Sequence, residues 1–106
     1  MSATPASAKA SRDWDAIVIH AEDNVAVALR DCPAGTVRVR RGGAVESVAV
    51  LQPIALGHKF ALSALPSGTV IRKYGESIGR AIAPIAAGEH VHVHNLASQR
   101  ARHAPA

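Results

Sequence analysis

The sequence predicts a compact, mostly-β single domain, and two observations support this fold class. Apolar and polar residues alternate over several short stretches, as in the segment TVRVR at 36–40. A period of two is typical of a strand with one buried face. The stretches are separated by glycine and proline, which favour turns, and a chain of 106 residues is expected to form one domain.

One local pattern occurs four times along the chain. A small or apolar residue is followed by two residues, a glycine and an extended segment, as in CPAGTVRVR (32–40), IALGHKFAL (54–62), LPSGTVIRK (65–73) and IAAGEHVHVH (85–94). Glycine adopts positive φ at little cost, so each glycine predicts a tight turn that leads into a strand. The four turn positions are Gly35, Gly57, Gly68 and Gly88.

Further strands are expected in segments dominated by apolar residues, at 15–20, 25–29, 44–51 and 78–85. Gly42 and Gly43 lie between two of the expected strands and predict a two-residue hairpin turn. Residues 60–65 are expected to form one short helical turn.

Charge is distributed unevenly between the middle of the chain and its ends. The net charge is +4, but eight Lys and Arg residues balance eight Asp and Glu residues between positions 13 and 96. We expect a folded domain over 13–96, a disordered N-terminal tail over 1–12 and a flexible C-terminal tail over 97–106. A neutral domain in a chain with only 3% aromatic residues is not expected to bind nucleic acid.

Cysteine content and hydropathy indicate the compartment. Cys32 is the only cysteine, so no disulfide can form within the chain, as is usual in the cytoplasm. No apolar run approaches the ~18 residues of a membrane-spanning helix. The first residues lack the apolar segment of a secretory signal. We therefore expect a cytoplasmic protein that does not bind a membrane.

Three of the six histidines lie in the segment GEHVHVHNL, at 88–96. If 89–94 is a strand, His90, His92 and His94 share one face while Val91 and Val93 fill the core. Neighbouring histidines would lie ~6.7 Å apart and the outer two ~13 Å apart. A metal site would then need His90, His92 and a ligand from elsewhere. The imidazoles could instead hold anionic groups or transfer protons, or form a solvated strand face.

Two further polar clusters follow turn glycines. In GHKF (57–60), His58 and Lys59 offer adjacent donors to a carboxylate or phosphate, although an ordinary polar loop has the same pattern. In RKYGESIG (72–79), Lys73 and Tyr74 lie at a strand end, where either can be a surface or rim residue. No nucleophile triad, phosphate-binding loop or cysteine-rich metal motif is present, and nothing distinguishes Asp15, Glu22 or Asp23 as a general base.

Four segments together resemble a known family. DNVAVAL (23–29), GHKFAL (57–62), KYGESIGRA (73–81) and IAAGEHVHVHNL (85–96) are similar in order and spacing to the amino-terminal SAF-type domain of the altronate/galactarate dehydratase family. The same domain, as a separate chain, resembles the small subunit of altronate dehydratases and the alpha subunit of sulfolactate sulfo-lyase. The resemblance runs from about residue 14 to 96 and implies a β-clip fold.

The resemblance also implies an activity: a lyase that removes water from a sugar acid to give a 2-keto-3-deoxy acid. It implies a divalent metal, iron(II) or manganese(II), shared with a separate large catalytic subunit, so this chain is not expected to be active alone. A homo-oligomer is compatible with it. Carried onto this sequence, catalytic roles fall to His92 and His94, metal ligation to His90 and His92, and substrate binding to His58, Lys59, Lys73, Tyr74 and Asn95.

Two alternatives remain open at this point. One is the alpha subunit of a sulfolactate sulfo-lyase, which has the same architecture and a different reaction. The other is a non-enzymatic binding module of SAF type. Such a module would have no reason to keep the GHK, KYG and histidine segments together.

Overall fold

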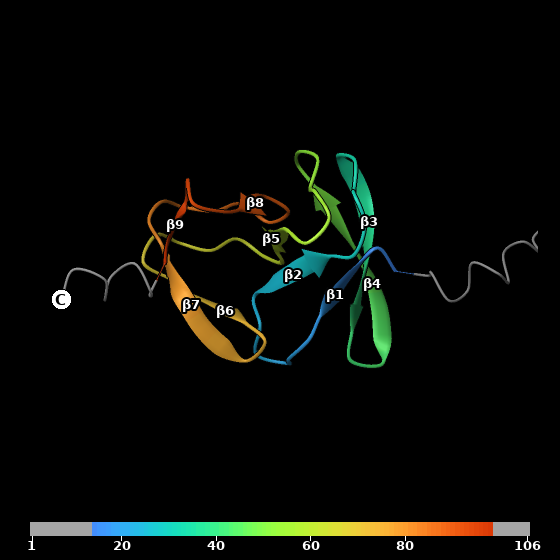
Figure 1. Cartoon of the computed structure of the whole chain (residues 1–106), viewed down its shortest axis with the longest axis horizontal. Coiled ribbons are helices and arrows are strands. Elements are labelled where there is room, and N and C mark those ends of the chain that lie inside the picture. Colours follow the sequence, from blue (N-terminus) through green and yellow to red (C-terminus); the bar gives the residue numbers. More distant parts are fainter. Residues whose placement is uncertain (1–13, 99–106) are drawn as a thin grey trace, which may run out of the picture.

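The computed structural model describes residues 14–98, and every regular element in that range is a β-strand. The expected mostly-β fold is therefore confirmed (Figure 1). Residues 1–12 and 99–106 of the expected tails lie outside the described residues. The strands are β1 (Ala16–Val18), β2 (Val25–Ala28), β3 (Gly35–Arg41), β4 (Ala44–Val50), β5 (Lys59–Ala61), β6 (Val70–Lys73), β7 (Glu76–Ala81), β8 (His90–Val91) and β9 (Leu96–Ser98).

The strands form two sheets. A six-stranded sheet has the order β4-β3-β1-β2-β5-β8, and a three-stranded sheet has the order β6-β7-β9. The pair β1–β3 is parallel and all other neighbours are antiparallel. Figure 1 shows the β3–β4 hairpin at one end of the molecule and β6, β7 and β9 at the other, with β1, β2 and β5 between them.

The four glycine turns form two pairs, each joined by a bridge between the residues that precede the glycines. All four glycines have positive φ, at 125°, 85°, 91° and 81° in chain order, as the sequence predicts. The residue three positions before each glycine forms an isolated bridge to its counterpart, Cys32 with Ile54 and Leu65 with Ile85. We call residues 28–57 the first clip and residues 61–88 the second clip. The two bridges thus close two consecutive segments of the SAF-like β-clip fold.

The core consists mostly of aliphatic side chains in two clusters. Phe60, fully buried in the first cluster, is its only aromatic residue. Ile71 and Ile85 are among the largest buried residues of the second cluster. β5 contributes to both clusters, because Phe60 packs in the first and Ala61 in the second. β5 therefore joins the two clusters of the core.

Several predicted boundaries differ from the structure. Residues 60–65 form no helical turn, because Phe60 and Ala61 pair with β2 and are fully buried there. The strand expected at 78–85 is β7, which begins two residues earlier and ends at Ala81. β9 extends through Ser98 and pairs with β7, so the described fold continues two residues beyond the expected end at 96. The predicted hairpin at Gly42 is confirmed, with φ of 62° and Arg41 paired with Ala44.

Candidate functional site

The pairing of β5 with β8 brings histidines from the two sides of the second clip together. Lys59 pairs with Val91 and Phe60 with His90 in antiparallel register. Continued by one residue, this register places His58 opposite His92. The ring centroids of His58 and His92 are 4.9 Å apart, and those of His58 and His90 are 5.1 Å apart.

His58, His90 and His92 form a compact group that we call the imidazole trio. One ring nitrogen from each lies within 4.8 Å of the others. Nδ1 of His58 and Nε2 of His90 are 2.9 Å apart and share a hydrogen bond, whose donor depends on the tautomer. Two metal ligands at ~2.1 Å and at a right angle lie ~3.0 Å apart, so this spacing suits a bound ion. The near-parallel rings, with interplanar angles of 12–23°, would turn to aim all three nitrogens at one ion.

The strand that carries the histidines ends at Val91, and a turn follows it. The backbone N–H of Asn95 donates to the carbonyl of His92 at 3.1 Å and closes the turn. The prediction that Val93 fills the core is wrong: its side chain is 77% exposed at the turn. The turn also brings His94 back, so its ring centroid lies 5.7 Å from that of His90 rather than the ~13 Å of a straight strand.

Asn95 supports this turn from the interior. Its side chain is buried, its Oδ1 accepts the N–H of His92 at 3.0 Å, and its Nδ2 donates to the carbonyl of His90 at 2.9 Å. Both the oxygen and the nitrogen of the side-chain amide are thus hydrogen-bonded to backbone groups. Substrate contact through Asn95 stays a prediction, while the geometry makes it a support for the imidazoles.

The environment favours neutral imidazoles. Burial lowers the pKa of His90, and the neighbouring His58 adds repulsion against a second positive charge. Burial likewise lowers the pKa of His92, with a further contribution from His58. A neutral ring keeps one lone pair, which a metal ion or a transferred proton requires.

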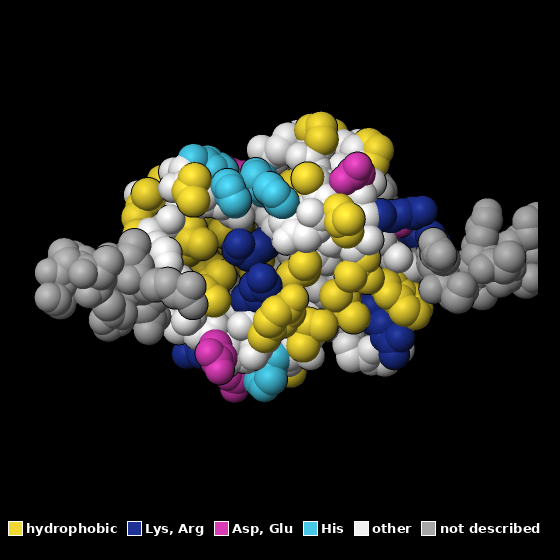
Figure 2. Space-filling view, viewed as in Figure 1, with side chains coloured by type: hydrophobic (Ala, Val, Ile, Leu, Met, Phe, Trp, Pro, Cys, Tyr) yellow, Lys and Arg dark blue, Asp and Glu magenta, His cyan; other side chains and the backbone are white. Residues whose placement is uncertain are grey.

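Two lysines lie beside the histidines. Lys59 in β5 is partly buried, and burial lowers its pKa, with a further contribution from the ammonium of Lys73 at the end of β6. Within residues 14–98 neither lysine forms an ion pair. Figure 2 shows dark-blue basic side chains in a hollow directly below the cyan histidines. Two ammonium groups without a carboxylate partner form a surface suited to an anion.

Tyr74 completes the arrangement. It is the first residue of the turn between β6 and β7, has a φ of 58°, and is about half exposed. The Nζ of Lys73 lies 4.8 Å from the centroid of its ring. All the residues predicted to act at the site therefore lie in or next to one cluster, in which the charge of Lys59 helps to lower the pKa of His90 and His92.

Sequence reasoning missed the residues that hold the cluster in place. Gln52 accepts the backbone N–H of His90 through Oε1 at 3.1 Å, and so joins β8 to the first clip. Asp23 and Asn24 bond to the β6–β7 hairpin, about 50 positions later in the chain. Both lie in the segment DNVAVAL, but nothing in the sequence reveals which distant backbone groups they bind.

Comparison with known proteins identifies the family of the chain. A model of the altronate/galactarate dehydratase SAF domain matches residues 14–99. The chain belongs to this SAF-domain family. It is 52% identical over 80 residues to an altronate dehydratase of Escherichia coli and 46% identical over 79 residues to one of Bacillus subtilis, each match covering 74% of this chain. The matched region is only 15% of the length of those two relatives.

A second group of family members is smaller. The chain is 45% identical over 47 residues to the (2R)-sulfolactate sulfo-lyase subunit alpha of Paracoccus pantotrophus. That match covers 44% of this chain and 70% of the relative. The relatives thus include both long dehydratases and a short subunit. In the part of the chain that the structure describes, no helix has the length and apolar character needed to cross a membrane.

Proposed function

We propose that this SAF domain is the small subunit of a metal-dependent sugar-acid hydro-lyase of the altronate/galactarate dehydratase type, acting in the cytoplasm with a separate large catalytic chain. One observation carries the proposal: an imidazole trio biased toward its neutral form lies beside two lysines that have no ion-pair partner among residues 14–98. Family membership supports the reaction class. The name of the short alpha-subunit relative supports a role as a subunit.

In this proposal Lys59 and Lys73 bind the carboxylate of the sugar acid. Each ammonium offers three donors, and a carboxylate between them relieves their mutual repulsion. Tyr74, exposed beside Lys73, offers a ring face and a hydroxyl to the carbon chain and its hydroxyl groups. These residues bind and orient the substrate next to the imidazoles.

The imidazole trio fits the iron(II) or manganese(II) that the family resemblance implies. Imidazole nitrogen is a common ligand of such ions, and all three donors come from this chain, so His58 would be the third ligand beside His90 and His92. The ion, when bound, supplies Lewis-acid stabilisation of the negative charge that develops as the proton next to the carboxylate leaves. In this proposal His58 is a metal ligand, while its substrate-binding role stays a prediction of the family resemblance.

With His92 assigned to the trio, His94 is the imidazole left to transfer a proton. It is exposed, and its ring lies tilted against His90. In the proposed reaction the ring of His94 donates its proton to the departing hydroxyl group, which leaves as water. The groups of the large chain would take the proton from the carbon next to the carboxylate.

The alpha subunit of a sulfolactate sulfo-lyase is the second candidate. The observation in its favour is length, because this chain matches 70% of one such subunit and only 15% of an altronate dehydratase. Sulfolactate carries a sulfonate and a carboxylate, and two lysines would suit that pair of anionic groups.

The deciding experiment is co-purification of the tagged chain from its native extract, followed by assay with iron(II) or manganese(II). Production of a 2-keto-3-deoxy acid from altronate or galactarate, dependent on both chains, would support the proposal. Release of sulfite from sulfolactate would support the second candidate instead. Full turnover by the isolated 106-residue chain would contradict the subunit role.

A further inference from the structure

We infer that Asp23 is a positioning residue of the candidate site, because its buried carboxylate holds Tyr74 in the left-handed conformation and thereby fixes Lys73 beside Lys59. The inference rests on the proposed function only in taking Lys59 and Lys73 as the anion-binding pair. It assigns a role to an acid that neither the sequence pattern nor the family resemblance distinguishes.

The turn between β6 and β7 has an unusual residue for its shape. Lys73 pairs with Glu76, so the loop contains only Tyr74 and Gly75, and their φ values are 58° and 80°. A two-residue hairpin with both φ values positive is a type I′ turn, where Asn-Gly is the preferred sequence. A bulky side chain is disfavoured at the first position. Within residues 14–98, Tyr74 is the only residue other than glycine with positive φ.

Asp23 supplies the interaction that keeps the turn in this shape. Its side chain is 3% exposed. Oδ2 accepts the N–H of Tyr74 at 2.9 Å and Oδ1 accepts the N–H of Gly75 at 2.7 Å. Oδ2 also accepts the N–H of His20 at 3.1 Å. Two successive N–H groups that converge on one anion form a backbone nest, and here the anion is a side chain of the same protein.

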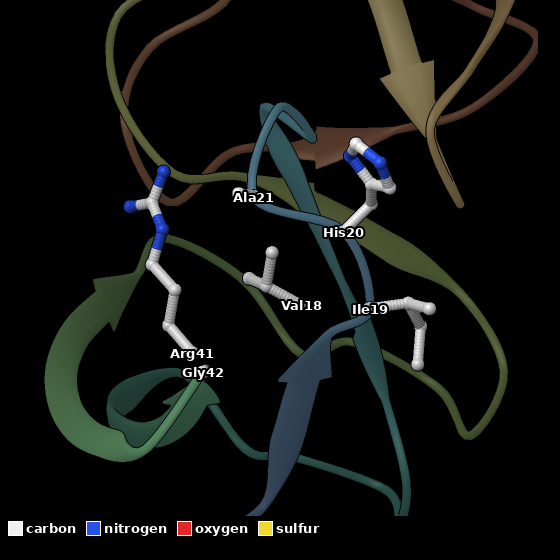
Figure 3. A pocket seen from close by; sticks show the side chains of 6 residues that line it. All are labelled: Val18, Ile19, His20, Ala21, Arg41 and Gly42. Carbon is white, nitrogen blue, oxygen red and sulfur yellow. The ribbon is translucent and has the colours of Figure 1, made fainter.

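Neighbouring residues hold the same turn from other sides. The side-chain amide of Asn24 forms two hydrogen bonds with the backbone of β6. Its Oδ1 accepts the N–H of Arg72 at 2.8 Å, and its Nδ2 donates to the carbonyl of Val70 at 2.9 Å. The ring of His20 lies against Gly75, where a Cβ would come within 2.9 Å of it. His20 and Arg41 line opposite sides of a pocket of about 260 Å³, as Figure 3 shows. Residues 20–24 thus form a clamp on the β6–β7 hairpin.

The clamp offsets two unfavourable interactions in the β6–β7 hairpin. The backbone of Tyr74 is strained, and the ammonium of Lys73 lies close enough to Lys59 to disfavour its charged form. Neither the backbone strain nor the charge repulsion stabilises the fold. Strained residues of this kind concentrate at functional sites. A fixed hairpin keeps the two ammonium groups ready for an anion instead of letting them separate.

The test uses NMR on the labelled full-length chain with two acids changed in turn. Asp23→Asn removes one of the acceptor oxygens from the clamp. Asp31→Asn is the matched control, because exposed Asp31 accepts a single N–H, from Leu56, in the first clip. The readouts are the ring-current shift that Tyr74 imposes on the side chain of Lys73 and the affinity for galactarate.

In Asp23→Asn we expect the ring-current shift to disappear and the affinity for galactarate to fall about tenfold, the loss of one charge-assisted contact. Asp31→Asn should change neither. Adding Tyr74→Gly to Asp23→Asn should restore most of the Tm that Asp23→Asn loses, because glycine adopts positive φ without a clamp. An unchanged ring-current shift in Asp23→Asn, or the same loss in Asp31→Asn, would overturn the inference.

A second comparison decides the matter even if Asp23→Asn does not fold. Tyr74→Gly and Tyr74→Ala remove the same ring, but only glycine relieves the strain, so the glycine variant should have the higher Tm. Equal Tm values would overturn the inference. If the wild-type chain binds neither altronate nor galactarate, the proposed anion-binding role of Lys59 and Lys73 fails, while the ring-current comparison still decides the role of Asp23 and the Tm comparison still tests the strain at Tyr74.

Discussion

Nδ1 of His58 and Nε2 of His90 lie 2.9 Å apart, although 32 positions separate the two residues in the chain. The contact follows from the β5–β8 register, which brings both sides of the second clip together. Two nitrogens at this spacing can share either a proton or a metal ion, and the third nitrogen of the trio favours the ion.

Replacement of His58 by asparagine should therefore weaken manganese(II) binding by at least about tenfold, because a tridentate site becomes bidentate. His20→Asn is the control, since this exposed histidine lies outside the trio. Titration of the metal-free chain with manganese(II), followed by electron paramagnetic resonance, measures the affinity. Equal affinity in the two variants would contradict ligation by His58.

The lowered pKa of His90 predicts a pH dependence of stability in the metal-free chain. The unfolded chain protonates this imidazole near its usual pKa of ~6.5, whereas the folded chain does so only at lower pH. The contribution is therefore fully present above ~6.5 and is lost as pH falls toward the folded value. Tm should decrease as the pH is lowered below about 6.5. The decrease should be smaller in His90→Gln, and it should be unchanged in His20→Gln.

Gly88 should tolerate no side chain. A Cβ at Gly88 would lie 1.8 Å from the carbonyl oxygen of Ala49, whereas one at Gly57 would meet nothing within 4 Å. Both glycines have positive φ, so only Gly88→Ala combines strain with a collision. We expect Gly88→Ala to reduce the free energy of unfolding by about 3 kcal/mol and Gly57→Ala by about 1 kcal/mol. Urea unfolding measures both, and similar losses would show that the close approach does not matter.

Val93 provides a test of contact with the large chain. Its exposed side chain lies in the turn after β8, between His92 and His94 in the sequence. Val93→Asp should leave the free energy of unfolding within about 0.5 kcal/mol and weaken co-purification of the large chain. Val45→Asp, in the β3–β4 hairpin at the far end, should not weaken it (Figure 1). A strongly destabilised Val93→Asp would mean that the side chain is buried.

Short-range patterns in the sequence predicted the parts of the fold that depend on them. The four glycine turns and the Gly42 hairpin depend on local conformational freedom, and all were predicted. The buried pair Phe60 and Ala61 was misassigned to a helical turn, because only pairing with β2 makes that segment extended.

The candidate site was predicted as a set of residues but not as a geometry. The histidine row was treated as a straight strand, and the buried amide of Asn95 bends it into a turn. Asp23 had no local signal, because its partners Tyr74 and Gly75 lie about 50 positions away. Contacts over such distances are set by topology, which periodicity does not encode.

The second clip, residues 61–88, lies entirely between His58 and His90. An ion held by both histidines would act as a covalent cross-link does, closing a loop that contains the whole second clip. Closure of a long loop removes conformational entropy from the unfolded chain. In a chain with a single cysteine, a bound ion would stabilise the fold as a disulfide does in other small proteins.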